Sequence, residues 1–242
     1  MKNKRKQIKT CILILVFGVF TNNLCHAQAA LLVLIFGDKV ATENFHMSID
    51  GGINFSYMPG LDNSKMRYGY YFGLGTFLKL NDKWAFTPEF KPLSQRGARK
   101  ITPLFVYNDI SEPQYDLLLN YIDIPLMVQY KIKPNFFVSA GPQISFLTKA
   151  EQETNGTTTE SNQQITISED FKSSFNPLYI SFPVEFGYSF PELIPGHGMD
   201  LKIRYCIGIN DIIKDQAYGN SRLSSLQVFA SFPFIKKEVK VK

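Results

Sequence analysis

The sequence predicts an all-β fold in which eight antiparallel strands form an up-and-down barrel. Three observations predict it. Eight segments alternate between apolar and polar residues, short and long connections follow one another between them, and the charged residues of each segment lie opposite its apolar ones. A period of two residues is typical of strands. A connection of two or three residues joins antiparallel neighbours.

The clearest pair of strands lies in residues 121–146, where two alternating runs flank the turn Lys133-Pro134-Asn135. The even-numbered residues of the first run are apolar, whereas the odd-numbered ones include Asp123 and Lys131. The other six segments span residues 45–57, 68–80, 84–93, 178–190, 199–210 and 226–234. Six prolines inside these runs cannot donate a ladder hydrogen bond, so we expect bulges or shorter strands near them. They are Pro88, Pro92, Pro125, Pro142, Pro183 and Pro233.

The connections indicate a barrel in a membrane rather than a soluble sandwich. Residues 81–82, 133–135 and 191–198 form the shorter connections, and they alternate with longer polar stretches at 59–67, 95–116, 148–177 and 211–222. Outer-membrane barrels have short periplasmic turns and long extracellular loops. A sandwich gives no reason for so regular an alternation.

The N-terminus predicts export through a cleaved signal peptide. Basic residues precede the apolar run 11–20, and the small-residue sequence Ala27-Gln28-Ala29 follows it, with cleavage expected after Ala27 or Ala29. The alternative is a lipoprotein acylated at Cys25, but the polar residues Asn22 and Asn23 just before it fit that poorly. The apolar run is also shorter than the roughly 20 residues of a membrane helix.

Removal of residues 1–29 changes the charge of the chain. They hold five of the 26 Lys and Arg and none of the 21 Asp and Glu, so 21 residues of each sign remain. A balanced chain gives no indication of nucleic-acid binding. Cys11 and Cys25 lie in the signal peptide, so Cys206 alone is expected to remain in the processed chain. We therefore expect no internal disulfide, metal site or cofactor.

The charged strand residues predict a polar network inside the barrel. In an outer-membrane barrel the apolar face meets lipid and the polar face lines the interior. An eight-stranded barrel is about wide enough for its own side chains, so we expect a network of ion pairs, with a narrow polar pathway or a small-ligand site as the alternative. The predicted lumen residues are Asp50, Lys79, Glu89, Lys91, Asp123, Lys131, Glu185, Lys202 and Arg204.

Three stretches of sequence resemble the PorT-like outer-membrane β-barrel proteins. They read LNDKWAFTPEF at 80–90, NYIDIPLMVQYKI at 120–132 and FVSAGPQISFL at 137–147, and the resemblance covers about residues 46–234. It implies a small antiparallel barrel in the outer membrane of a Gram-negative envelope. Some relatives are linked to protein secretion across that membrane. The chain departs from the usual pattern because IKKEVKVK follows the last aromatic residue, Phe234.

The expected organisation is a signal peptide at 1–29, an apolar arm or short helix at 30–44, the barrel at 45–234 and a charged tail at 235–242. The arm is expected at the periplasmic rim. The alternatives are a plug inside the barrel and an unprocessed membrane anchor.

The sequence predicts no enzyme. Only His46 and His197 remain after processing, and no catalytic motif surrounds them. We expect a structural or interaction module, with an accessory component of protein secretion or envelope assembly as the alternative and a lipid-modifying barrel enzyme as a remote third. Residues 148–177 are expected to form a mobile hydrophilic shield. Arg96, Arg99 and Lys100, beside the apolar ITPLFVY, are expected to contact anionic lipid or a protein partner at the extracellular loops; the periplasmic rim is the other partner surface.

Overall fold

The computed structural model describes residues 42–60, 64–159, 161, 163–194, 197–215 and 220–234. The predicted signal peptide, most of the apolar arm and the charged tail lie outside these residues. So does the side chain of His197. None of the helices in the described part of the chain is long and apolar enough to cross a membrane.

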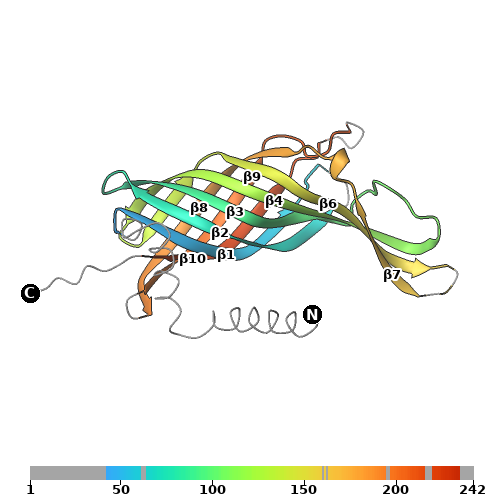
Figure 1. Ribbon diagram of the computed structural model, residues 1–242, viewed down its shortest axis with the longest axis horizontal. Helices are drawn as coiled ribbons and strands as arrows, with labels where there is room; N and C mark the ends of the chain where they lie inside the picture. The colour runs from blue at the N-terminus through green and yellow to red at the C-terminus, as the bar shows by residue number, and fades with distance from the viewer. Residues whose placement is uncertain are drawn as a thin grey trace, which may run out of the picture.

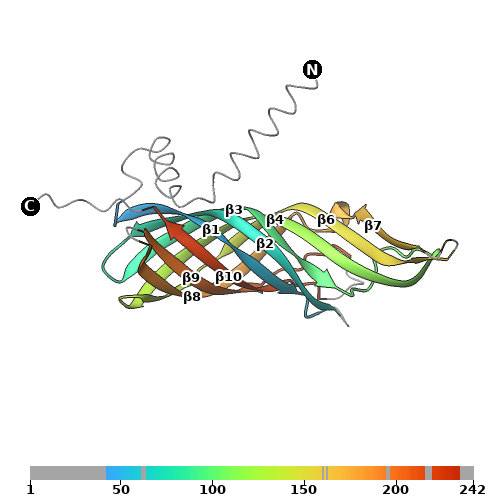
Figure 2. The ribbon, with the colours of Figure 1, turned by 90° about the horizontal axis from the view of Figure 1, so that it is seen from below.

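The described residues form a closed antiparallel barrel whose strands follow one another around the ring (Figures 1 and 2). The strands are β1 (Phe45–Tyr57), β2 (Lys65–Lys79), β3 (Trp84–Arg99), β4 (Ile110–Lys133), β5 (Phe136–Ala140), β6 (Gln143–Thr158), β7 (Gln164–Asp170), β8 (Leu178–Ile194), β9 (His197–Gly208) and β10 (Ser224–Pro233). Strands β5 and β6 pair in turn with the same neighbours, β4 and β8, and act as one strand of the wall. The ring therefore has eight positions, as the sequence predicts.

The first and last strands close the ring. Residues of β1 from Ser48 to Tyr57 pair with β10, while the other edge of β1 pairs with β2. Each wall strand thus has a partner on both sides, and no backbone edge within the ring is open to the surroundings. This arrangement satisfies the backbone polar groups of a strand that crosses lipid.

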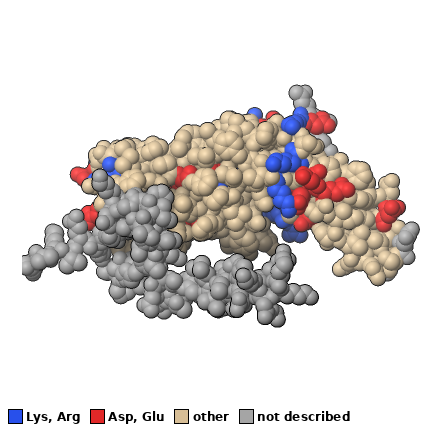
Figure 3. Space-filling model, viewed as in Figure 1, with Lys and Arg blue, Asp and Glu red and all other residues tan. Residues whose placement is uncertain are grey.

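The wall is apolar on the outside and polar on the inside. Along β9, Leu201, Ile203 and Ile207 are 42%, 48% and 46% exposed, whereas Lys202 and Arg204 between them are buried. Charged side chains gather toward the two ends of the surface seen in Figure 3. A soluble protein would place these faces the other way round, so the polarity confirms the predicted transmembrane barrel.

Several strands continue beyond the predicted wall at the long-loop end. Residues 95–116 and 148–177 were expected to be loops, but β3 reaches Arg99, β4 begins at Ile110, and β6 and β7 form a hairpin. This hairpin and β4 extend well past the rest of the barrel (Figure 1). The extension of β6 still buries alternate residues, among them Gln152 and Thr154, but polar residues stand on both of its faces, so no apolar–polar alternation marks it in the sequence. The sequence pattern therefore underestimated the strand lengths, and the predicted shield is largely a paired sheet.

A β-bulge in β3 decides which of its residues face inward. The pairing of β3 with β4 shifts between Lys91 and Ser94, across Pro92. Before the bulge Glu89 and Lys91 are buried, and after it Ser94 and Arg96 are buried. The inward-facing set changes from odd to even numbers because the bulge adds one residue to one strand.

Candidate functional site

The barrel interior holds a charge-balanced set of buried side chains. Four carboxylates and four cations are at most 7% exposed. They are Asp50, Glu89, Asp123, Glu185, Lys91, Arg96, Lys202 and Arg204. Buried charges are tolerated when they are paired and hydrogen-bonded. The equal numbers of the two signs leave no net charge in this set.

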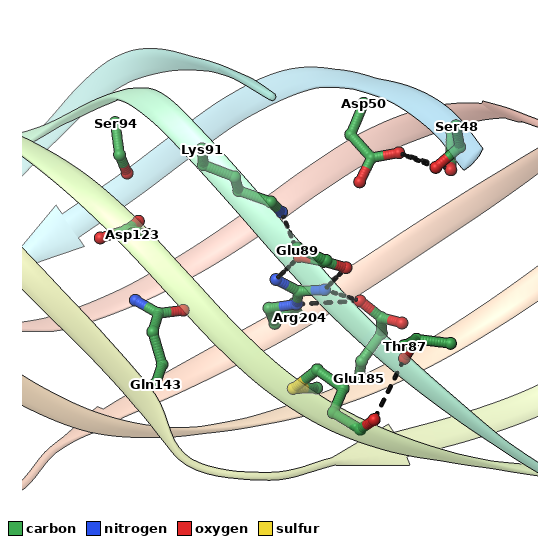
Figure 4. Close-up of polar contacts among 12 residues, drawn as sticks. Ser48, Asp50, Thr87, Glu89, Lys91, Ser94, Asp123, Gln143, Glu185 and Arg204 are labelled. Atoms are coloured by element: carbon green, nitrogen blue, oxygen red, sulfur yellow. Dashed lines mark hydrogen bonds and ion pairs between the residues drawn. The ribbon is translucent and has the colours of Figure 1, made fainter. Parts of the chain in front are cut away.

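Arg204 is the centre of the network (Figure 4). Its Nη1 and Nη2 atoms donate to the two carboxylate oxygens of Glu89, at 2.7 and 2.6 Å, and its Nε donates to Glu185 Oε2 at 2.9 Å. Glu185 lies on the adjacent strand β8, but Glu89 lies on β3, which does not pair with β9. Arg204 therefore connects separate parts of the wall through the lumen. The two-pronged contact with Glu89 is the strongest geometry that arginine offers a carboxylate.

Lys91 completes this layer between two aromatic rings. Its Nζ lies 2.8 Å from Glu89 Oε2 and 4.4 Å from the ring centroids of both Tyr71 and Phe229. The guanidinium of Arg204 also lies over the Phe229 ring, at 4.9 Å. Cations that face aromatic rings inside a protein gain cation–π attraction in addition to their ion pairs.

Arg96 forms a second layer nearer the long-loop end. Its guanidinium pairs with Asp123 and lies 5.4 and 5.7 Å from the ring centroids of Tyr121 and Tyr179. Arg96 was expected to contact lipid or a partner, and this expectation is wrong, since the residue is 1% exposed. The bulge at Pro92 reverses the inward-facing set of β3, and the strand continues past its predicted end at Leu93.

Of the other residues predicted to face the lumen, Asp50 lies inside it, whereas Lys79 and Lys131 do not. Asp50 accepts hydrogen bonds from Ser48 and Ser231, at 2.9 and 2.5 Å. Lys79 and Lys131 are exposed at the short-turn rim, where Lys79 pairs with Asp82 at 2.8 Å, so neither belongs to the buried set.

Arg99 and Lys100, expected to contact lipid or a partner, are exposed at the long-loop end, and both contact Asp116. Arg99 Nε lies 3.5 Å from Asp116 Oδ2, and the Lys100 backbone N–H donates to Asp116 Oδ1 at 3.1 Å. Asp116 lies on the extended part of β4, a stretch that was expected to be loop.

An apolar cluster closes the lumen at the long-loop end. It combines wall residues such as Leu117 and Leu119 with loop residues such as Ile101, Phe175 and Ile212. An isolated bridge between Phe175 and Ile213 and a hydrogen bond from the Asn176 N–H to the Ile212 carbonyl, at 2.7 Å, join two of the loops. The cluster begins at the level of Arg96, which pairs in register with Leu119, and its loop residues continue toward the long-loop end.

The short-turn end contains a cavity instead. Its volume is about 470 Å³, and inward-facing residues from β1, β2, β4, β5, β8, β9 and β10 line it. Phe77, Phe137 and Pro233 are among its apolar walls, and Glu43, Lys131 and Asp200 are among its charged ones. A pocket of about 20 Å³ next to it is lined by Glu89 and Lys202. The mouth thus leads to the edge of the ionic network.

The described residues contain no cluster of three or more His, Cys, Asp or Glu side chains that could hold a metal ion. Cys206 is a buried free thiol. What the described site can do is hold charge in a fixed arrangement.

Comparison with known proteins identifies the family. The family described as outer membrane protein beta-barrel domain matches residues 36–214. Among solved structures, Neisserial surface protein A is 11% identical, with a TM-score of 0.43, over 80% of this chain and 98% of that one. Ail, the attachment invasion locus protein of Yersinia pestis, is 14% identical, with a TM-score of 0.41, over 80% of this chain and 100% of that one. OprG from Pseudomonas aeruginosa is 11% identical, with a TM-score of 0.43, over 81% of this chain and 98% of that one.

No protein in a search of curated sequences matches this chain. The family match nevertheless covers most of the chain and includes the strands that carry the ionic network. The chain therefore belongs to the outer membrane protein β-barrel domain family and is an outer-membrane barrel.

Proposed function

We propose that this protein is a non-enzymatic interaction module whose extracellular sheet meets a protein partner. The observation that supports this proposal is the contrast between the two parts of the molecule. Buried ion pairs cross the middle of the lumen, and the apolar cluster lies at its long-loop end. The sheet of β4, β6 and β7 extends beyond it. Such a barrel offers its outer surface, rather than a pore, to the exterior.

The extended sheet is held together by continuous strand pairing. Strand β4 pairs with β6 as far as Ile110 and Thr158, and β6 pairs with β7 from Glu151 to Thr157. The connection 100–109 is attached to it, because Gln152 Oε1 accepts from the Leu104 N–H at 2.6 Å and Gln152 Nε2 donates to the Phe105 carbonyl at 2.8 Å.

The sheet also offers contact surfaces of two kinds. Among the described residues β7 pairs with β6 alone, which leaves its other edge available for a strand of a partner. Phe105 and Val106 add exposed apolar area, at 48% and 54%.

The lipid is the second partner in this proposal. Lysines and arginines form a band at the long-loop end of the surface in Figure 3, and acidic residues lie farther out. Arg99 on β3 and Lys149 on β6 have side chains that are 47% and 51% exposed. Basic side chains next to an apolar wall attract anionic headgroups.

Co-purification tests the protein partner. Replacing residues 156–165 by Asn-Gly retains the pairing of Asn155 with Thr166 and shortens the hairpin with a compatible two-residue turn. After mild detergent extraction, a protein that co-purifies in stoichiometric amount with the full chain should be lost from the shortened variant and kept by Lys131→Gln at the opposite rim. Retention by the shortened variant and also by a Phe105→Ser, Val106→Ser variant would contradict the proposal.

An accessory role in secretion or envelope assembly is the alternative, and the cavity at the short-turn mouth favours it. A partner in the periplasm would reach the barrel there, and the PorT-like resemblance points to the same process. A stoichiometric secretion complex that depends on Lys131 and survives hairpin shortening would support this alternative. Planar-bilayer recording provides a separate check, because a filled lumen should give no single-channel steps under conditions in which a porin does.

A further inference from the structure

We propose that the cavity at the short-turn mouth binds a small zwitterion with an apolar body, of the class of an aromatic α-amino acid. The carboxylate of the ligand meets Lys202, its ammonium group meets Asp200, and its apolar body lies against the phenylalanine side chains of the wall. The cavity is at the opposite end of the barrel from the extended sheet, so the inference does not depend on the proposed protein partner.

Lys202 provides the positive charge of this site. Each of the other three buried cations, Lys91, Arg96 and Arg204, pairs with a carboxylate. Lys202 is 7% exposed, yet no residue in the described part of the chain forms a hydrogen bond or an ion pair with its Nζ atom. Its side chain lines the pocket of about 20 Å³ next to the cavity, the inner pocket. A buried ammonium group without a direct partner attracts an anion that reaches it.

Asp200 provides the negative charge. It lines both the cavity and the inner pocket. The inner pocket contains a second carboxylate, Glu89, but Arg204 and Lys91 already bind its two oxygens. Asp200 forms no ion pair with a described residue, and its interaction with Lys202 is one of longer range. A simple anion at Lys202 would be repelled by Asp200, whereas a zwitterion sets an opposite charge against each of them.

The rest of the cavity suits an apolar body of limited size. Phe77 and Phe137 face inward from β2 and β5, and Phe190 and Pro233 add to the apolar wall. The ring of His46 stacks on Phe77, with centroids 4.6 Å apart, and extends this surface toward the inner pocket. The volume of about 470 Å³ lies in the range of roughly 300 to 1,000 Å³ that small-molecule sites have. It leaves room for a molecule of amino-acid size.

The ionic network stops the ligand at this depth. Glu89 belongs to the wall of the inner pocket, and Arg204 binds both Glu89 and Glu185. Deeper entry would require these buried ion pairs to break. The site therefore binds its ligand at the mouth without passing it through the barrel.

Fluorine NMR with para-fluorophenylalanine tests the proposal on protein isolated from outer membranes and placed in lipid nanodiscs. Two analogues are the ligand controls. Para-fluoro-phenylpropanoate lacks the ammonium group, and para-fluoro-phenethylamine lacks the carboxylate. The amino acid should bind at least about tenfold more tightly than either analogue, because each analogue leaves one charge of the site without its partner. Equal binding of the three compounds, or no binding of the amino acid, would overturn the proposal.

Variants assign the two charges. Lys202→Met should weaken binding of the amino acid at least about tenfold and remove its advantage over the amine. Asp200→Asn should remove its advantage over the propanoate. Lys133→Met is the control, because Lys133 is exposed at the same rim and does not line the cavity.

Gln129→Phe provides a second way to block the site. Gln129 lines both the cavity and the inner pocket, so a phenyl ring there fills the space between them while the ion pairs of Arg204 stay in place. This variant should lose binding of the amino acid. Heat-modifiable gel mobility selects the folded molecules of every variant. Binding that is unchanged in Gln129→Phe, or in folded Lys202→Met, would overturn the proposal.

Discussion

Arg204 and Glu89 form a two-pronged ion pair across the barrel lumen, although they are 115 residues apart in sequence and lie on strands that do not pair. The contact joins β9 to β3 through the interior, in addition to the hydrogen bonds that run around the wall. Because both side chains are buried, water does not screen their interaction as it would at the surface. The ion pair is therefore a direct target for stability measurements.

Glu89→Gln should destabilise the barrel by about 3 to 5 kcal/mol, because it leaves Arg204 and Lys91 with one carboxylate fewer in a buried site. Urea unfolding of protein folded in lipid vesicles, followed by the fluorescence of Trp84, measures the loss. Asp82→Asn is the control. The Asp82 side chain is 96% exposed, and the change should stay within about 0.5 kcal/mol. Equal stability of Glu89→Gln and the parent chain would contradict the assigned network.

Arg96 and Arg99 should respond differently to the same substitution, although they are three residues apart. Arg96→Ala leaves the buried carboxylate of Asp123 unpaired and should cost about 3 to 5 kcal/mol. Arg99→Ala removes a surface pair whose arginine side chain is 47% exposed, and should cost at most about 1 kcal/mol. The same unfolding assay compares them. Similar losses in the two variants would mean that β3 is not bulged as described.

Gly187 should not tolerate a methyl group. An alanine Cβ at this position would overlap the ring of Phe137, which is 3% exposed and would have to leave its present packing and shift into the cavity that it lines. Gly187→Ala should therefore cost about 1 to 3 kcal/mol. At Gly51 an added Cβ has no neighbour within 4 Å, so Gly51→Ala serves as the matched control. A neutral Gly187→Ala variant would show that Phe137 can rearrange.

The loop residue Tyr107 should lose its phenol proton at a higher pH than an ordinary tyrosine. Its hydroxyl donates to Glu169 Oε1, and this hydrogen bond raises the pKa of Tyr107 to about 12. A raised pKa means that the folded state retains the phenol proton. The stabilising contribution is therefore complete below pH 10 and is lost as the pH rises toward 12. The difference in absorbance at 295 nm between the parent chain and Tyr107→Phe isolates this transition.

Glu169→Gln provides the control for that titration. It removes the carboxylate acceptor, so the Tyr107 transition should move down toward the ordinary tyrosine value near 10. An unchanged transition would show that the hydrogen bond does not hold the loop 100–109 against β7 in solution.

The outline of the barrel could be predicted from sequence because lipid and a polar lumen impose opposite demands on successive residues. Residues such as Ile203 and Arg204 show that demand directly. The same reasoning failed for Arg96, since a bulge reverses the inward-facing set without any change in residue type. The extension of β6 and β7 was also not predicted, because polar residues stand on both faces of these strands and no apolar–polar alternation remains.

By itself the sequence determined that the chain forms an eight-stranded barrel and which face of most wall strands is polar. A period of two and the rhythm of the connections are local properties, and they remain readable along the chain. Only the tertiary structure decided which charges pair, because Arg204 meets Glu89 through the closure of the ring and not through neighbourhood in sequence. It also decided that the two ends differ, with an apolar cluster over one and a cavity in the other. Both features form where residues from many strands and loops meet inside the barrel. The alternation within one strand carries no information about such contacts between strands.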